Sequence, residues 1–360
     1  MTASVRYQIT APDPRTHLFH VRCTVVQPDA SGQVFSLPSW IRGSYLVRDF
    51  AKHVVTLKAF AGRQPIAFER LDKRSLRCAP VRGALRLEYT VHAYDESVRK
   101  AWLDQRRGFF NASSLCYLPQ GLEQAPCEIE IKKPAGMKGW KLATTLRAKK
   151  ISKDGFGIYA AADYEDLLDH PVEMGDFERH EFVVDGIPHA LVLAGRTDTE
   201  GPRIARDLGK ICCVERELFG QEPALREYLF LTHVTGSGYG GLEHRSSTAL
   251  ICSRGDLPRP GEIKISKSYR TFLGLCSHEY FHLWNVKRIT AQSFLDSDLA
   301  REAYTRDLWH YEGVTSYYDD LFLLRAGLID APAYLDLLAE AATRMARAPS
   351  HAVQTLSDAS

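Results

Sequence analysis

Alternating apolar and polar residues dominate the chain from residue 3 to about residue 160. Short runs with this period of two, separated by turn-forming residues, occur at positions 17–28, 33–41, 53–60, 85–94 and 127–134. The pattern is typical of strands that bury one face, and helical spacing is weak here. The N-terminal part therefore predicts an all-β, sandwich-like domain.

The rest of the chain mixes strand-like runs with helical spacing. Positions 180–195 indicate a strand pair, and positions 228–235 and 242–252 indicate one strand each. Four helices are predicted where apolar residues recur at helical spacing, over positions 203–220, 268–288, 301–328 and 332–348. The acidic stretch 162–177 reads as the crossing between domains. We therefore expect a β domain over residues 1–165 and an α+β domain over residues 166–360.

Composition and charge exclude several classes of partner. The 360 residues carry 46 Lys and Arg against 44 Asp and Glu, which gives a formal charge of +2. A nearly balanced chain has no basic field for a nucleic-acid backbone or an anionic membrane, and its apolar runs are too short to span a bilayer. We expect neither nucleic acid nor membrane as a partner, and the oligomeric state stays open.

The N-terminal residues and the cysteines indicate a compartment. The N-terminus lacks the basic start and the apolar core of a signal peptide. The eight cysteines form no C-x-x-C pair, and most stand in apolar stretches, where a free thiol behaves as a small hydrophobe. These features predict a cytoplasmic protein with reduced thiols. The alternative is a periplasmic protein with some disulfides, whose leader has been removed.

The strongest chemical signal is the H-E-x-x-H sequence at residues 278–282. On a helix, His278 and His282 lie on one face and can bind the same metal ion. Glu279 can reach a metal-bound water as a general base. The alternative is a helix with two surface histidines, but the neighbouring Leu, Trp and Cys residues indicate a buried helix.

Zinc bound by two histidines needs a third protein ligand and an open position for water. Glu312 is the best candidate, because an unpaired carboxylate in a mostly apolar helix is unfavourable and a metal would remove that penalty. A salt bridge is its alternative role. Spacing alone leaves three other ligands open, namely Asp307, His310 and Asp319. Residues that could orient a ligand, or simply form a solvated face, are Ser316, Asp319 and Asp320.

The glycine-rich segment at residues 236–241 contains G-x-G-x-x-G. A dinucleotide-binding loop would open a helix, whereas the residues that follow are polar and β-branched and predict a strand. A flexible loop before an edge strand suits a protease better, since an extended peptide can add to that edge. We therefore expect Gly240 and Gly241 to contact substrate and Glu243 to pair with a substrate ammonium group.

Three motifs together resemble the glycyl aminopeptidase family of zinc metallopeptidases. They are G-G-L-E-H-x-x-S from residue 240, H-E-x-x-H-x-W-N-x-K-R from residue 278, and L-W-x-x-E-G-x-T-x-Y-Y from residue 308. Segments 40–48 and 107–111 extend the similarity into the β half, so it covers essentially the whole chain. The family belongs to the gluzincins, which implies a thermolysin-like catalytic domain. Members commonly carry a PDZ domain beyond the catalytic domain, and the sequence shows none. The chain stops at residues 354–360, inside a stretch that resembles the family's continuing catalytic domain, so we expect this domain to be incomplete at its C-terminus.

The resemblance implies a role for each matching residue. His278, His282 and Glu312 become the ligands of one zinc ion per chain, and Glu279 becomes the general base. Glu243 matches the position at which related aminopeptidases recognise the amino terminus. The expected activity is hydrolysis of N-terminal peptide bonds, with Gly or small residues favoured and a peptide with a free N-terminus as substrate. Two alternatives remain: a non-catalytic peptide- or protein-binding module on a peptidase fold, and a zinc endopeptidase.

Overall fold

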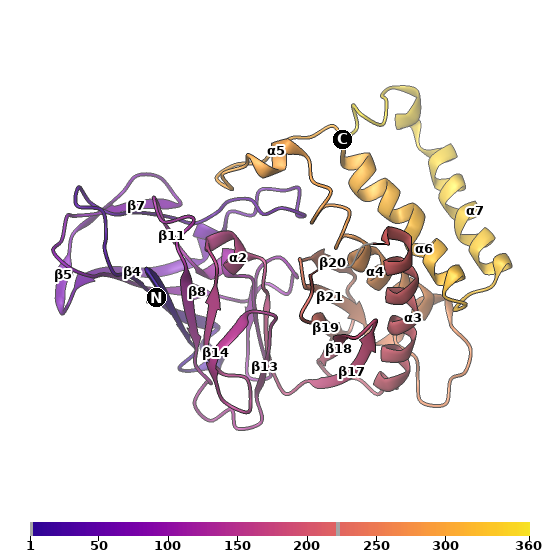
Figure 1. Ribbon diagram of the computed structural model, residues 1–360, viewed down its shortest axis with the longest axis horizontal. Helices are drawn as coiled ribbons and strands as arrows, with labels where there is room; N and C mark the ends of the chain where they lie inside the picture. Colours follow the sequence, from indigo (N-terminus) through magenta and orange to yellow (C-terminus); the bar gives the residue numbers. More distant parts are fainter. Residues whose placement is uncertain (1–2, 221–223) are drawn as a thin grey trace. The chain divides into compact units, whose positions relative to one another are not determined.

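The computed structural model describes residues 3–220 and 224–360 (Figure 1). The chain forms two compact units, the first comprising Met1–Phe177 and Ser297–Glu302 and the second comprising Glu178–Asp296 and Ala303–Ser360. The units divide after Phe177 rather than after residue 165, because the intervening stretch holds part of a helix and a whole strand that belong to the first unit. These are α2 (Tyr164–Leu168) and β16 (Val172–Gly175).

The largest sheet of the first unit has eight strands. Its order is β14-β15-β12-β1-β2-β8-β4-β5, and only the β1 and β12 pair is parallel. Along β8, Leu85, Leu87, Tyr89 and Val91 are buried while the residues between them are not, as the alternation predicts. The bounds are β1 (Val5–Thr10), β2 (Leu18–Val25), β4 (Val54–Ala61), β5 (Gln64–Ile66), β8 (Leu85–His92), β12 (Cys127–Ile131), β14 (Arg147–Ile151) and β15 (Gly157–Ala161).

Two further sheets complete the first unit. One has the order β13-β16-β10-β9, with β9 (Ala101–Leu103), β10 (Arg107–Phe110) and β13 (Lys141–Ala143). The other has the order β11-β3-β7-β6, with β3 (Val34–Ser36), β6 (Phe68–Arg70), β7 (Ser75–Cys78) and β11 (Leu118–Pro119). The unit is rich in β structure as predicted, but it has three sheets where a simple sandwich has two. Its short helices are η1 (Pro14–Thr16), η2 (Phe50–His53) and α1 (Ala112–Leu115).

The second unit is built on a five-stranded mixed sheet of order β17-β18-β19-β21-β20. Strands β18, β19 and β21 are parallel to one another, and the two edge strands are antiparallel to their neighbours. The predicted strand over 242–252 is two strands, with a turn at residues 244–246. The bounds are β17 (Glu178–Val184), β18 (Ile187–Ala194), β19 (Tyr228–Thr235), β20 (Gly240–Glu243) and β21 (Ser247–Ser253).

The helices of the second unit follow the predicted order with shorter extents. Helix α3 (Gly201–Phe219) ends as expected at Gly220, whose φ of 59° a left-handed C-cap requires. The helix expected over 268–288 is α4 (Lys267–Phe281), and the one expected over 301–328 is a π-helical turn, η4 (Trp309–Val314), followed by α6 (Thr315–Arg325). The others are η3 (Arg254–Asp256), α5 (Gln292–Leu295), α7 (Ala331–Arg347) and η5 (Pro349–Ala352).

Helix α4 is central to the second unit. It contacts α3, α6 and the strands β20 and β21, while α7 contacts α6 (Figure 1). Tyr269, Phe272, Leu273, Cys276 and Tyr280 of α4 are buried in the core. All eight cysteines are free. Within the described residues, no helix is long and apolar enough to cross a membrane.

Candidate active site

The sequence of α4 explains why its last turn carries the site. Ser266 caps the helix N-terminus by accepting a hydrogen bond from the Tyr269 N–H at 3.2 Å. The apolar face then locks the helix into the core, so the polar residues of the last turn have fixed positions. Glu279 and His282 are buried, with exposed fractions of 5% and 2%. A rigid, buried helix end is a suitable support for catalytic groups.

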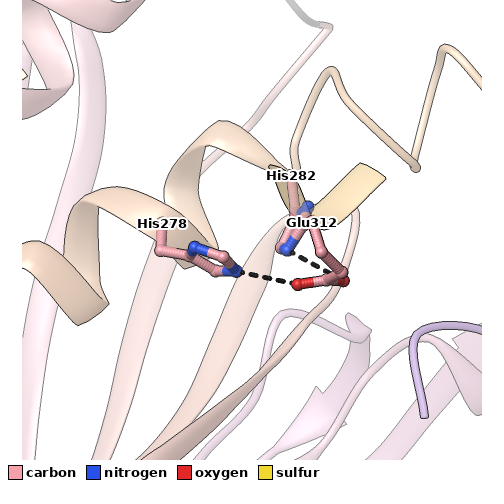
Figure 2. Close-up of side chains that lie close together, drawn as sticks. All are labelled: His278, His282 and Glu312. Atoms are coloured by element: carbon pink, nitrogen blue, oxygen red, sulfur yellow. Dashed lines mark hydrogen bonds and ion pairs between the residues drawn. The ribbon is translucent and has the colours of Figure 1, made fainter. Parts of the chain in front are cut away.

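Three predicted metal ligands come together at this helix end. Figure 2 shows the His278 and His282 rings on one helix and the Glu312 carboxylate, from a separate segment, pointing toward one another. His278 Nε2 lies 3.2 Å from Glu312 Oε2, and His282 Nε2 lies 3.8 Å from Glu312 Oε1. Tetrahedral zinc with bonds near 2.0–2.1 Å holds its ligand atoms about 3.3 Å apart. Both the donor set and the spacing therefore fit zinc.

Both imidazoles are oriented by a second hydrogen bond. His278 Nδ1 lies 3.0 Å from Asp319 Oδ2, and His282 Nδ1 lies 2.9 Å from the Asn285 carbonyl oxygen. Contacts of this kind fix the ring and the tautomer of a metal-binding histidine, and they leave Nε2 free for the metal. Asp319 thus touches a ligand histidine. Among the described residues, neither Asp307 nor His310 joins a group that could hold a metal ion.

The two histidines differ in charge. Burial and the nearby His278 charge lower the pKa of His282 to about 3, which keeps this imidazole neutral at physiological pH. Burial also lowers the pKa of His278, but hydrogen bonds to Asp319 and Glu312 outweigh this and place its pKa well above the usual value. A divalent cation between these side chains would take the place of the His278 proton.

A second cluster of donor atoms shares His282 with the first. Glu243, Glu279 and His282 are all buried, and their donor atoms lie within 4.8 Å of one another. Glu243 is at the end of the edge strand β20, so a residue far away in sequence reaches the helix that carries the H-E-x-x-H motif. Two carboxylates this close in a buried site favour a cation between or beside them.

Of the two predicted glycines, Gly241 lies against this cluster and Gly240 has no such contact. A side chain at Gly241 would overlap the carboxylate of Glu279, so any larger residue would force that carboxylate to move. Gly240 has open space around it, so a side chain would meet no clash there. Its φ of 149° nevertheless favours glycine, because other residues rarely adopt this backbone conformation. Gly241 therefore also determines where Glu279 can lie.

Replacing Gly241 with Ala is expected to displace the Glu279 carboxylate. A misplacement of about 1 Å in a catalytic group lowers activity about 100-fold, and we expect a loss of that order in kcat with zinc binding retained. Steady-state kinetics and zinc content are the measurements. The matched control is Gly255→Ala, where an added methyl group meets only ordinary contacts. Unchanged kcat in the Gly241 variant would contradict this role.

Two residues that support the site were not predicted. Ser277 Oγ lies 2.8 Å from Glu215 Oε1 on α3 and 3.0 Å from the Asp319 carbonyl oxygen. Glu215 is fully buried, and burial raises its pKa well above the usual carboxyl value. The signal was present in the sequence, because Glu215 stands on the same helical stripe as the apolar residues Ile204, Leu208 and Ile211.

The raised pKa of Glu215 has a consequence for stability. An acid whose pKa is higher in the folded state is favourable while protonated, and its contribution falls as pH rises above the unfolded-state pKa. Glu215→Gln, which cannot ionise, should therefore gain stability relative to wild type between pH 5 and pH 8, by up to about 1.4 kcal/mol per pH unit. Urea midpoints at both pH values measure this. Glu217→Gln, exposed on the same helix, should show no such trend.

Comparison with known families identifies the family of the chain. The Peptidase M61 N-terminal domain matches residues 6–176, and the M61 glycyl aminopeptidase domain matches residues 271–360. The chain belongs to the M61 peptidase family. The second match contains His278, Glu279, His282 and Glu312 of this M61 chain. Gly240, Gly241 and Glu243 lie between the two matched ranges, so neither family match covers them.

Solved structures resemble the M61 chain over most of its length. An aminopeptidase N family protein from Idiomarina loihiensis has a TM-score of 0.91 and 43% identity, over 93% of this chain and 57% of that protein's chain. The M61 chain thus spans 57% of the length of that relative. An M1 zinc metallopeptidase from Deinococcus radiodurans has a TM-score of 0.54 and 14% identity over 98% of this chain and 75% of its own, and so shares the fold. No curated protein matches.

Proposed function

We propose that this chain is a zinc aminopeptidase with one zinc ion per chain. The observation that carries the proposal is the convergence of His278, His282 and Glu312 beside the buried carboxylate of Glu279. The match to M61 glycyl aminopeptidases supports a preference for an N-terminal Gly or another small residue. The proposed reaction is hydrolysis of the first peptide bond of a peptide with a free N-terminus.

The Nε2 atoms of His278 and His282 and the carboxylate of Glu312 would hold the zinc ion. When bound there, zinc polarises the scissile carbonyl and lowers the pKa of a water molecule toward neutrality. The hydrogen bonds at both Nδ1 atoms keep the two rings directed at this position. Because the rings need not reorient when the metal binds, the site is organised in advance for it.

Glu279 acts as the general base in this proposal. Its carboxylate accepts a proton from the attacking water and then donates it to the leaving amine. The side chain is buried and lies against Gly241, which limits the positions that the carboxylate can adopt. A base held in one place within hydrogen-bond reach of both groups can serve both proton transfers.

Glu243 selects the substrate amino terminus. Its carboxylate lies within 4.8 Å of both Glu279 and His282, so an ammonium group bound to it would stand one short residue away from the reacting bond. The edge position of β20, paired only with β21 in the sheet order, supports an extended substrate that adds alongside. An internal peptide bond would bring no cation to Glu243, which argues against a zinc endopeptidase.

The experiment that tests this function compares a glycyl anilide with its N-acetylated form, using zinc-loaded protein. We expect cleavage of the free amine only. Glu243→Gln should lower kcat/KM for the free amine by roughly 10- to 100-fold, because a hydrogen bond to a charged group contributes about 1.5–3 kcal/mol. The matched control is Glu340→Gln, an exposed substitution on α7.

Each other outcome contradicts part of the proposal. Equal cleavage of both anilides would favour an endopeptidase that does not read the amino terminus. Cleavage of neither by protein with zinc bound would favour a peptide- or protein-binding module on a peptidase fold. Cleavage of the free amine by Glu243→Gln at the wild-type rate would support the aminopeptidase and remove Glu243 from its amine site.

A further inference from the structure

The third ligand is carried by an unusual turn. Glu312 lies within the π-helical segment Trp309–Val314, which continues directly into α6. A π-helical turn is wider than an α-helical one and is rare, and it is frequently found at functional sites. Such a turn needs support from outside the helix to persist, because the regular α-helical hydrogen bonds are shifted by one residue.

The side chain of Asn285 gives this turn its external support. Asn285 is 2% exposed, and its Nδ2 lies 3.0 Å from the His310 carbonyl oxygen, 3.0 Å from Thr315 Oγ1 and 3.3 Å from the Tyr311 carbonyl oxygen. All three neighbours can accept a hydrogen bond, so the amide nitrogen must face them. An oxygen in its place would meet carbonyl lone pairs.

The Thr315 hydroxyl connects Asn285 to the π-helical turn by hydrogen bonds. Thr315 is fully buried, and its hydroxyl donates to the Tyr311 carbonyl oxygen at 2.5 Å while accepting from Asn285. The hydroxyl therefore uses both its donor and an acceptor site on this turn. Asn285 and Thr315 together hold the two residues directly before Glu312.

The main chain of Asn285 also contacts His282, another of the proposed zinc ligands. Its carbonyl oxygen accepts the Nδ1 hydrogen bond of His282 at 2.9 Å. One residue thus contacts the ring of one proposed ligand through its main chain and the turn of another through its side chain. The distance between these two ligands depends on that residue, although neither Asn285 nor Thr315 touches the metal position.

We propose that Asn285 and Thr315 are positioning residues that set the place of Glu312 relative to His282 and so determine the affinity for zinc. This inference rests on the metal site of the proposed function. Outer partners of metal ligands typically change metal affinity by 10- to 100-fold when they are removed. A role in general stability alone would lower the melting temperature without changing the zinc affinity of the folded protein.

The test measures zinc dissociation constants of the full chain by competition with a chromophoric chelator. Asn285→Asp keeps the shape and the main-chain carbonyl but replaces the donor, and we expect about 10- to 100-fold weaker zinc binding. Thr315→Val keeps the shape and loses the hydroxyl, so it should weaken binding similarly. Thr315→Ser keeps the hydroxyl and should restore an affinity close to wild type.

Asn111→Asp is the matched control for Asn285→Asp. Asn111 is 1% exposed and also donates from Nδ2 to a backbone carbonyl, that of Val98 at 2.7 Å, in the first unit. It should keep wild-type zinc affinity even if its melting temperature falls. The Co²⁺ absorption spectrum of each variant reports the geometry of the bound metal independently of activity.

Each result decides the inference. Wild-type zinc affinity in both Asn285→Asp and Thr315→Val would overturn it, as would equal losses in Thr315→Ser and Thr315→Val. If Asn285→Asp fails to fold, the Thr315 pair still decides. Wild-type protein that binds no zinc would instead refute the metal site of the proposed function, which keeps the two failures apart.

Discussion

Replacing Glu279 with Gln is expected to reduce kcat by about 10²–10⁴-fold while zinc remains bound, which is the range that general acid–base catalysis contributes. The amide has the shape of the carboxylate and can occupy the same space beside Gly241, but it cannot accept a proton. The three proposed zinc ligands are untouched, so the metal content should not change. Kinetics on a glycyl anilide and metal analysis of the same sample measure both quantities.

The control for this prediction is Glu340→Gln, which has the same change of charge on an exposed part of α7. It should retain wild-type kcat. Full activity in Glu279→Gln with zinc bound would exclude Glu279 as the base. Loss of zinc from that variant would place Glu279 among the ligands, in agreement with the second donor cluster that it forms with Glu243 and His282.

Replacing Glu312 with Gln is expected to weaken zinc binding about 100-fold or more and to abolish activity at ordinary zinc concentrations. Loss of an outer partner alone weakens metal binding by 10- to 100-fold, so loss of a ligand should exceed that. The amide removes the charge that faces His278 and His282. Zinc dissociation constants measured by chelator competition, with activity across a zinc titration, give the result.

Asp307→Asn is the matched control for Glu312→Gln. Spacing alone left Asp307 open as the third ligand, but it is exposed and joins no donor group within the described part of the chain. It should retain wild-type zinc affinity. If Asp307→Asn lost zinc and Glu312→Gln kept it, the metal would be bound by a different set of residues from the one that the geometry supports.

Local patterns in the sequence predicted the parts of the site that depend on one element. His278 and His282 are four residues apart, so helical geometry alone brings them to one face, with Glu279 on the adjacent side of the same turn. The stop of α3 at Gly220 and the strand β19 follow equally local rules. The resemblance of three motifs to the glycyl aminopeptidase family singled out Glu312 as the third ligand. Spacing by itself had left it among several candidates.

The exact extents of two helices depended on how a single turn is hydrogen-bonded, which the sequence pattern does not show. The expected helices over 268–288 and 301–328 end or change at Phe281 and at the π-helical turn. Apolar periodicity does not distinguish hydrogen bonds to the fourth residue from bonds to the fifth over a single turn. The side chain of Asn285, which supports that turn, comes from a different segment.

The sequence by itself determined the residues on which the proposed chemistry depends most, because the helix that bears the H-E-x-x-H motif is a local structure with a fixed period. Only the tertiary structure decided how the other groups meet it. Glu243 on an edge strand, Glu312 on a π-helical turn, and Asp319 and Glu215 on separate helices converge on α4 through long-range packing. Such contacts join residues tens of positions apart, and no local rule of spacing or propensity encodes them.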